Sequence, residues 1–366
     1  MNSLDDRNLA VQIVQRNQGN LNERFIGAVS GVGETRTDFF ERVSALAVPG
    51  VCISLDVFGG PPDDAAWNLL RQAFLPDPPP VTWVIEDGVP AGVVRSAQAW
   101  VAEGVDYQRV AVRGEILGTV FDDGHACYLR LAGLIPGKGG GRGVETRDGL
   151  DQMNALLADA GMSFRNVVRT WVYLADILSW YGEFNKVRTR FFHDFGVFSG
   201  LVPASTGMAG GNRAGAALSG GLFAVAPRSR EVEVARVDSP LQCSARDYGS
   251  SFSRAVEITT PMSRRLLVSG TASIDRAGKT IFEGDLDAQV RQTFAVIKAI
   301  LQSRGMSWGD VTRAIGYFKP GQEADIERCL RECAPPIPLI PVINHVCRDD
   351  LLFESELDAL ALHESV

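Results

Sequence analysis

The alternation of apolar and polar residues near the C-terminus predicts a buried strand that carries two carboxylates. Side chains two positions apart on a strand share a face. Glu354 and Glu356 therefore point one way, while Phe353, Ser355 and Leu357 point the other. A carboxylate in an apolar strand is costly to bury unless it is paired or protonated. This pattern leaves two interpretations open: a salt bridge to an arginine on a neighbouring strand, or a catalytic acid.

A longer pattern of apolar residues occurs twice in the chain. The segment 161–174, GMSFRNVVRTWVYL, aligns without gaps with 305–318, GMSWGDVTRAIGYF, and a helical periodicity precedes each copy, at 148–160 and at 286–304. Such a repeat predicts a duplicated α+β module. Each module is expected to run strand, strand, helix, strand, helix, strand, as a mixed sheet covered on one face by two helices. A sister module or another subunit is expected to cover the other face.

The length of the chain predicts more than one hydrophobic core. At 366 residues it exceeds the size at which single cores stop growing. The stretch LPDPPPV at 75–81 interrupts regular structure and marks a division. We expect an N-terminal α/β extension at 1–80 packed on the first module, a first module at 81–228, and a second module at 229–366 that carries the predicted acid.

Composition and charge narrow the classes of partner. Apolar residues make up 45% of the chain, charged residues 22%, and the net charge is -8. Nucleic-acid binding depends on clustered Lys and Arg, so nucleic acid is not expected as a partner. Neither a signal-peptide pattern at the N-terminus nor an apolar run of bilayer length occurs, so we expect no membrane partner and a cytoplasmic location. The six scattered cysteines are typical of reduced thiols.

Motifs for metals and nucleotides are weak. None of the four histidines forms a His-x-x-x-His or His-Glu-x-x-His arrangement. Cys329 and Cys333 stand four apart on a predicted helix and could share a metal, but a second pair at ligand spacing does not occur. The glycine-rich run at 135–143 lacks the spacing of a phosphate-binding loop. The sequence therefore predicts neither a metal nor a cofactor.

A predicted helix at 179–192 carries a cation among aromatic residues. Tyr181, Phe184, Arg188 and Phe192 fall three to four residues apart and share one helix face. One interpretation is that the arginine stem packs on the rings with its head in water. The other is that the guanidinium is held in a pocket, where it grips a substrate carboxylate.

The duplicated unit resembles the Rid superfamily, the reactive-intermediate deaminases also called YjgF-like proteins. The segments GMSFRNVVRTWVYL, FNKVRTRFF, VPASTG and FESE match the motifs of that superfamily in order. The resemblance implies modules of the chorismate-mutase-like α+β fold, which form trimers with pockets at module interfaces, so we expect trimer-type packing and a homo-oligomer. Those enzymes carry an arginine in a Pro-Ala-Arg-Ser motif, where this chain has Ser205.

Within this superfamily the chain is similar to the chorismatases, a two-module branch that hydrolyses chorismate to pyruvate and a ring product. The terminal Cys-Arg-x-Asp-Leu-Leu-x-Glu motif of these enzymes occurs here from Cys347 to Glu354. The resemblance implies that Glu354 is the catalytic acid, that Cys347 is a pocket residue, and that Arg188 and Tyr181 grip the substrate. We add Glu356, on the same strand face as Glu354, to the substrate-binding set.

The chemistry of an enol ether agrees with this assignment. Its hydrolysis begins with protonation of the methylene carbon, which needs a carboxylic acid kept neutral by an apolar pocket. Arginines then hold the substrate carboxylates, and no cofactor is required. The departures at Ser205, at Gly182, where chorismatases have an arginine, and in the glycine-rich stretch 207–216 keep two alternatives open. These are a Rid-type imine or enamine deaminase and a non-catalytic protein that binds a small ligand.

Overall fold

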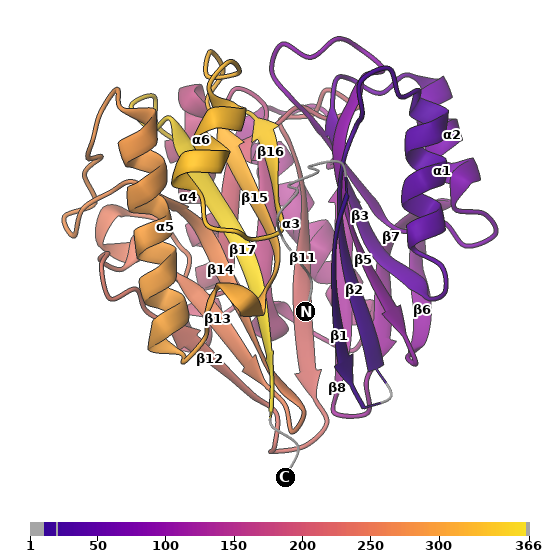
Figure 1. Cartoon of the computed structure of the whole chain (residues 1–366). Helices are drawn as coiled ribbons and strands as arrows, with labels where there is room; N and C mark the ends of the chain where they lie inside the picture. The colour runs from indigo at the N-terminus through magenta and orange to yellow at the C-terminus, as the bar shows by residue number, and fades with distance from the viewer. Residues whose placement is uncertain (1–10, 20, 364–366) are drawn as a thin grey trace.

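The computed structural model describes residues 11–19 and 21–363, and these form three mixed sheets with helices packed on one face of each (Figure 1). We call the three units module A (11–103), module B (106–227) and module C (233–362). Residues 1–10, 20 and 364–366, which include the start of the expected N-terminal extension, lie outside the described residues. The expected α+β class with tandem modules is confirmed, because each sheet is mixed and the two predicted modules recur as B and C.

Module A has the sheet order β1-β2-β5-β3-β4, with β3 and β4 parallel and the other pairs antiparallel. Its elements are β1 (Val11–Gln18), β2 (Leu21–Val29), α1 (Arg36–Leu46), β3 (Val51–Gly59), α2 (Asp64–Ala73), β4 (Val81–Ile85) and β5 (Val94–Glu103). Thr35 and Asp63 begin the two helices, since their side chains accept the backbone N–H groups of Asp38 and Ala66. The strand β3 is buried along its whole length, including the polar residues Ser54 and Asp56 in its otherwise apolar sequence.

The expected boundary at residue 80 falls inside this sheet. The strand β4 pairs with β3, and β5 lies between β2 and β3. The segments that we expected to open the first module therefore complete module A. The first 80 residues are not an extension packed on another module, because without β4 and β5 their own sheet would lack its central strand.

Module B has the order β10-β9-β11-β8-β7-β6, and β9 and β10 are its parallel pair. Its strands and helices are β6 (Asp106–Val112), β7 (Glu115–Asp122), β8 (Ala126–Leu134), α3 (Arg142–Asp159), β9 (Val167–Leu174), α4 (Ile177–Asp194), β10 (Ala204–Ala209) and β11 (Leu218–Pro227).

Module C has the order β12-β13-β14-β17-β15-β16, and β15 and β16 are parallel. Its strands and helices are β12 (Glu233–Val237), β13 (Ala255–Thr259), β14 (Ser263–Ala272), α5 (Leu286–Ser303), β15 (Val311–Phe318), α6 (Ile326–Cys333), β16 (Leu339–Ile343) and β17 (Phe353–Leu362).

The repeated Gly-Met-Ser segments are equivalent turns in modules B and C. Each connects a long helix to the strand that follows it, α3 to β9 and α5 to β15. Ser163 and Ser307 cap a short 3₁₀ turn, and the side chains of Asn166 and Asp310 accept the backbone N–H of the capping serine in return. This reciprocal capping explains why the serine recurs with a polar residue three positions later.

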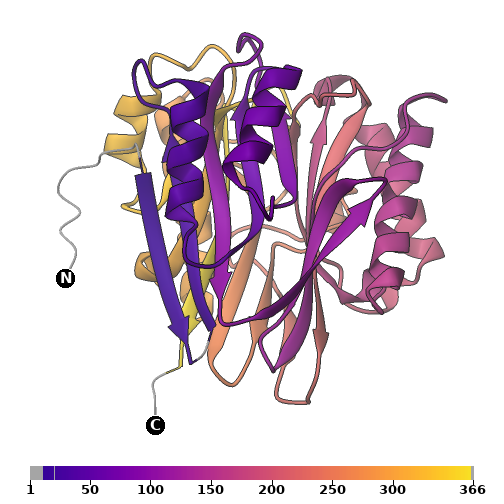
Figure 2. The same ribbon diagram turned by 90° about the vertical axis from the view of Figure 1, so that its right-hand side faces the viewer.

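The three modules are arranged around a shared core, with the helices outside and the sheets facing inward (Figures 1 and 2). The edge strand of each module lies against the next: β4 against β8, β10 against β14, and β16 against β2. One apolar cluster contains Phe58, Tyr173 and Tyr317, one residue from each module. The sister modules thus cover the inner sheet faces. Among the described residues, no helix is both long and apolar enough to span a bilayer.

Candidate active site

A cavity of about 720 Å³ lies between modules B and C. Module B contributes the inner face of α4 and the strand β10, and module C contributes β14, β17 and the segments that precede β13 and β17. The side chains that matter for its chemistry are Tyr181, Arg188, Ser205, Arg254, Cys347 and Glu354. Four of the five residues that the sequence placed in a site are therefore brought together at this interface.

Glu354 lies in the cavity wall, near the start of β17 and opposite Tyr317 of β15. Its side chain is almost completely buried, with 6% of the residue exposed. Burial, assisted by the charge of Glu356, raises the pKa of Glu354 to about 8, while nearby arginines such as Arg254 oppose the shift. At neutral pH the carboxyl is therefore mostly protonated and able to donate a proton.

Gly270 on β14 makes room for this acid. A β-carbon at that position would overlap the Glu354 carboxylate and would also approach Thr206 of β10. The backbone N–H of Gly270 donates to the Thr206 hydroxyl at 3.1 Å, which ties the two modules together beside the acid. The glycine in the sequence SGTAS thus leaves the space into which the carboxyl group extends, and a larger residue there would displace that group.

Arg188 projects from α4 into the cavity rather than into bulk water. The residue is 3% exposed, and its guanidinium lies 5.0 Å from the ring centroid of Phe184. One amino group donates to Asn185 Oδ1 at 2.6 Å and the other to Ser205 Oγ at 3.2 Å. The guanidinium therefore lies in a pocket and not in bulk water, whereas its role in holding a substrate carboxylate stays a prediction. The contacts fix the direction of the guanidinium before any ligand binds.

Arg254 and Arg348 are cavity residues that sequence reasoning did not place in the site. Arg254, at the entry to β13, is 3% exposed and donates through Nε to the carbonyl of Cys243 at 2.9 Å. Arg348 donates to the carbonyl of Gly278 at 2.6 Å. The sequence gives little signal for Arg254, because it stands alone before an apolar strand. Arg348 directly follows Cys347 in the terminal motif, and this position in the sequence could have indicated that it lies in the site.

Tyr181 and Cys347 form neutral parts of the wall. Burial raises the pKa of the Tyr181 hydroxyl to about 12, and Cys347 adds to that shift. Burial together with the adjacent Glu354 likewise raises the pKa of the Cys347 thiol to about 12. A thiol with a raised pKa is a poor nucleophile at neutral pH. These two side chains can shape the cavity and donate hydrogen bonds, but they are not suited to covalent chemistry.

Glu356 is not in the position that we expected. Its carboxylate is completely buried inside the interface, where Arg169 and Arg313 each donate to it at 2.6 Å and Trp171 Nε1 donates at 3.0 Å. Although burial opposes it, the two arginines hold the pKa of Glu356 below its usual value. Our assignment to substrate binding is corrected: for this residue the salt-bridge interpretation holds, since its oxygens are already occupied by these donors.

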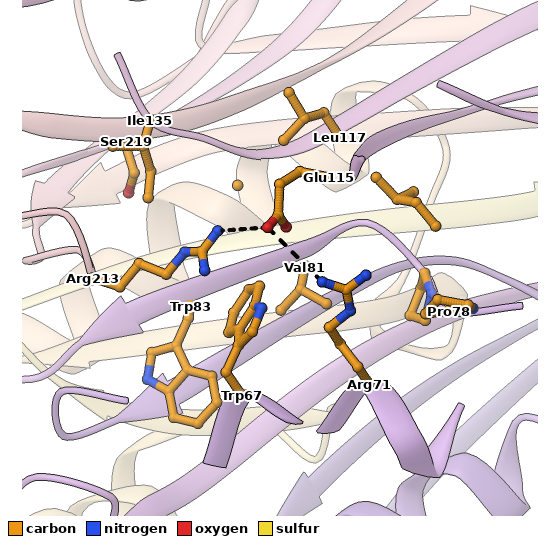
Figure 3. Close-up of a pocket in the computed structure, with 13 residues that line it drawn as sticks. Trp67, Arg71, Pro78, Val81, Trp83, Glu115, Leu117, Ile135, Arg213 and Ser219 are labelled. Atoms are coloured by element: carbon orange, nitrogen blue, oxygen red, sulfur yellow. Dashed lines mark ion pairs between the residues drawn. The ribbon is translucent and has the colours of Figure 1, made fainter. Parts of the chain in front are cut away.

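An equivalent but nearly closed cleft, about 40 Å³ in volume, lies between modules A and B. Figure 3 shows Glu115 of β7 between the guanidinium groups of Arg71 and Arg213, at 3.9 and 3.3 Å. The guanidinium of Arg213 also stacks over Trp67 of α2, 4.4 Å from the ring centroid. Ser219 of β11 lines this cleft. Protein side chains therefore occupy the space that is open between modules B and C.

Comparison with known proteins supports both the module and the architecture. Residues 246–341 match the family model described as endoribonuclease L-PSP. A crystal structure of a chorismatase is 18% identical and covers 95% of this chain and 100% of its own, with a TM-score of 0.63. Among curated proteins, none matches the sequence.

Smaller structures match one part of the chain. A putative endoribonuclease L-PSP from Entamoeba histolytica is 18% identical, and a YjgF-family member from Neisseria meningitidis is 21% identical. They cover 35% and 34% of this chain and 98% of their own, each with a TM-score of 0.29. The expected resemblance thus holds for the sequence of residues 246–341, which match the L-PSP family model, and for the fold of the whole chain, which is that of the chorismatase structure.

Proposed function

We propose that this chain is an enzyme that hydrolyses the enol ether of chorismate or a closely related small carboxylate and releases pyruvate. The observation that carries the proposal is Glu354, a carboxyl group with a pKa of about 8 in the wall of a 720 Å³ cavity that also contains Arg188 and Arg254. A neutral acid facing buried cations is the combination that this reaction needs. The fold shared with a chorismatase structure agrees with it.

The first chemical step is proton transfer from Glu354 to carbon. The π electrons of the enol ether form a new C–H bond with the carboxyl proton, which leaves an oxocarbenium ion in the substrate and a carboxylate on Glu354. A water molecule then adds to the cationic carbon, and its proton passes back to Glu354. The resulting hemiketal collapses to pyruvate and the ring alcohol. One water is consumed in total, and the step balances without a redox partner.

The role of the arginines is to hold the anionic substrate. Chorismate carries two carboxylates, and the cavity has guanidinium groups from both modules, Arg188 from module B and Arg254 and Arg348 from module C. Arginine binds carboxylates through paired N–H donors, which fixes orientation as well as charge. We assign Arg188 and Arg254 to the two carboxylates, so that the enol ether lies beside Glu354.

The test is pyruvate release from chorismate by the purified protein. Glu354→Gln keeps the shape of the side chain but cannot donate the proton, so we expect its rate to fall by about 10²- to 10⁴-fold. The matched control is Glu115→Gln, which alters a carboxylate in the equivalent cleft and should leave the rate within about twofold. Absence of pyruvate release from the wild-type protein, or a Glu354→Gln rate equal to the wild type, would refute the proposal.

A second candidate is hydrolysis of an imine or enamine, favoured by the L-PSP match over residues 246–341. In that reaction the ionised Glu354 would position and activate water. Ser205 stands where Rid deaminases are expected to carry an arginine, and Arg188 donates to its hydroxyl, so a cation is still close to that position. Faster ammonia release from 2-aminoacrylate generated in situ than pyruvate release from chorismate would favour the deaminase over the chorismatase-like enzyme.

A further inference from the structure

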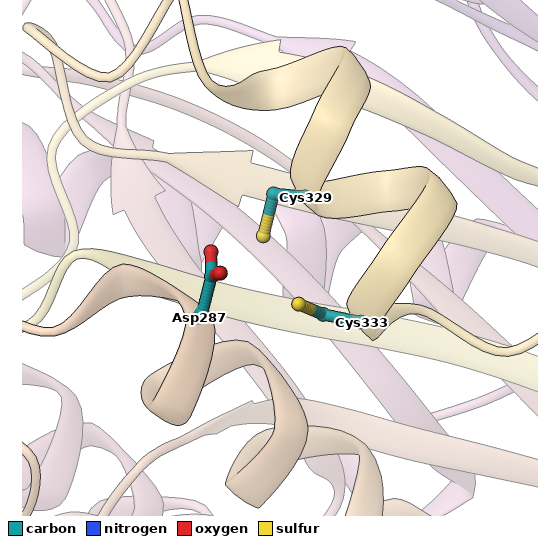
Figure 4. Close-up of side chains that lie close together, drawn as sticks. All are labelled: Asp287, Cys329 and Cys333. Carbon is teal, nitrogen blue, oxygen red and sulfur yellow. The ribbon is translucent and has the colours of Figure 1, made fainter.

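Two thiols and a carboxylate meet between the two helices of module C, away from the candidate active site, and one of the thiols, that of Cys329, is completely buried. Cys329 and Cys333 lie on one face of α6, and Asp287 lies in the first turn of α5 (Figure 4). Their sulfur and oxygen atoms all lie within 4.8 Å of one another. Sequence spacing gave two potential ligands four residues apart, and the packing of α6 on α5 adds the third.

We propose that Asp287, Cys329 and Cys333 bind a thiophilic divalent cation of the zinc class. Zn²⁺ is held in proteins by cysteine sulfur at about 2.3 Å and by carboxylate oxygen at about 2.0–2.2 Å. The three side chains point toward one another between the helices (Figure 4), and a bound cation would draw their ligand atoms closer than the present separations of up to 4.8 Å. A water molecule would complete a tetrahedral shell, as in zinc sites with three protein ligands.

The surroundings of Asp287 suit a metal ligand. Arg328 donates to both of its oxygens, at 2.7 and 3.0 Å. A carboxylate has about four lone-pair positions, so two remain beside Arg328; the Cys329 thiol donates to one of them, and a cation would replace that thiol proton. Partners of this kind orient metal-binding side chains and are part of many metal sites. The charge of Arg328 also offsets the excess negative charge that two thiolates and one carboxylate place around a divalent ion.

Metal binding must compete with protonation of the thiols. Burial raises the pKa of Cys329 above its ordinary value and, to a smaller extent, raises that of Cys333. The cation must therefore displace protons from both thiols. The affinity of the site for the cation should therefore rise with pH over the neutral range. Two thiols that only hydrogen-bond to each other would bind no cation at any pH in this range.

The experiment is a titration of the reduced full-length protein with Cd²⁺ in a buffer with a phosphine reductant. Cadmium bound to thiolate gives an ultraviolet charge-transfer band, and we expect saturation at one equivalent per chain, with Zn²⁺ displacing the probe. Cys333→Ser, at a partly buried position, should weaken binding at least about tenfold, and Asp287→Asn should weaken it by about 10- to 100-fold. Cys127→Ser is the matched control, because this half-buried thiol lies in module B.

Circular dichroism of each variant separates loss of a ligand from loss of folding. If Cys333→Ser and Asp287→Asn stay folded and bind Cd²⁺ as tightly as the wild type, or if Cys127→Ser removes the band, the proposed site is wrong. A titration of the wild-type protein that gives no charge-transfer band would refute the proposed site and leave the two thiols as a hydrogen-bonded pair. Neither result depends on the activity of the cavity between modules B and C.

Discussion

The cleft between modules B and C and the cleft between modules A and B are built from equivalent elements but differ in what they hold. In both, a helix and a parallel edge strand of one module face the central strands of the next. The first is a cavity of about 720 Å³ with Glu354, a carboxyl group of raised pKa, in its wall, and the second, of about 40 Å³, is lined by the half-exposed Glu115 ion pairs. The repeated fold provides the scaffold, and single residues determine which interface is open.

Strand register identifies these residues. Glu354 pairs with Tyr317 and Ser219 pairs with Tyr173, each tyrosine being the penultimate residue of the strand that precedes a helix. Two residues further along, Glu356 is matched by Gly221, where a β-carbon would overlap the carbonyl oxygen of Leu131 and lie 2.9 Å from a guanidinium nitrogen of Arg130. At this strand position module C has a buried carboxylate that is paired with two arginines. Module B has a glycine there, and the guanidinium of Arg130 lies beside it.

The largest expected effect comes from breaking the buried ion network that distinguishes the two interfaces. Glu356→Gln leaves Arg169 buried without its charged partner and leaves Arg313 with Asp358 alone, and loss of one partner of a buried pair typically costs about 3–5 kcal/mol. We expect that loss in the free energy of unfolding, measured by denaturant titration at pH 7. Glu354→Gln, two residues away, is the control and should not destabilise the protein. Equal losses for both variants would show that the two carboxylates have the same role.

The sequence predicted the orientation of these two carboxylates but not their different environments. The period of two placed Glu354 and Glu356 on one face, and the structure confirms it, since Phe353 and Leu357 pack in the core under the helices. What distinguishes the two is long-range: Glu356 meets Arg169 of module B, 187 residues away in the chain. Periodicity along one strand contains no information about which side chains another module brings to it.

Module A was missed for a related reason. The repeat in modules B and C was recognised from the capped Gly-Met-Ser turn, whereas module A connects α1 to β3 through a different sequence around Val48 and Pro49. Its topology is the same although that motif is absent, because the order of strands and helices depends on apolar patterning rather than on one turn. The proline-rich stretch before β4 then suggested a boundary where the chain in fact continues into the same sheet.

The next largest effect is expected from removing an arginine from each of the two clefts. Arg188→Ala removes a buried guanidinium that we assign to a substrate carboxylate, and such truncations cost about 2–5 kcal/mol. We therefore expect kcat/KM for pyruvate release to fall by about 10²-fold or more, with Arg188→Lys recovering part of the loss in KM. Arg71→Ala, the matched change in the cleft between modules A and B, should stay within about twofold. A similar loss for both arginines would mean that the open cavity is not where the substrate binds.

The smallest effect on activity is the pH dependence, which we assign to Glu354, since Ser219 at the equivalent strand position of the other cleft has no carboxyl group. Catalysis needs protonated Glu354, so kcat/KM should be level below its pKa of about 8 and fall about tenfold per pH unit above it.

The pH dependence of the free energy of unfolding is an independent test of the raised pKa of Glu354. The folded-state pKa of Glu354 lies above the unfolded value of about 4.3, so the stability that its protonation contributes is complete below pH 4.3 and is lost as pH rises towards 8. Relative to Glu354→Gln, the wild type should therefore lose up to about 1.4 kcal/mol per pH unit across that window and nothing further above it. A constant difference between the two proteins from pH 5 to pH 9 would mean that Glu354 ionises normally, and the contrast between the two clefts would then be one of shape and not of acidity.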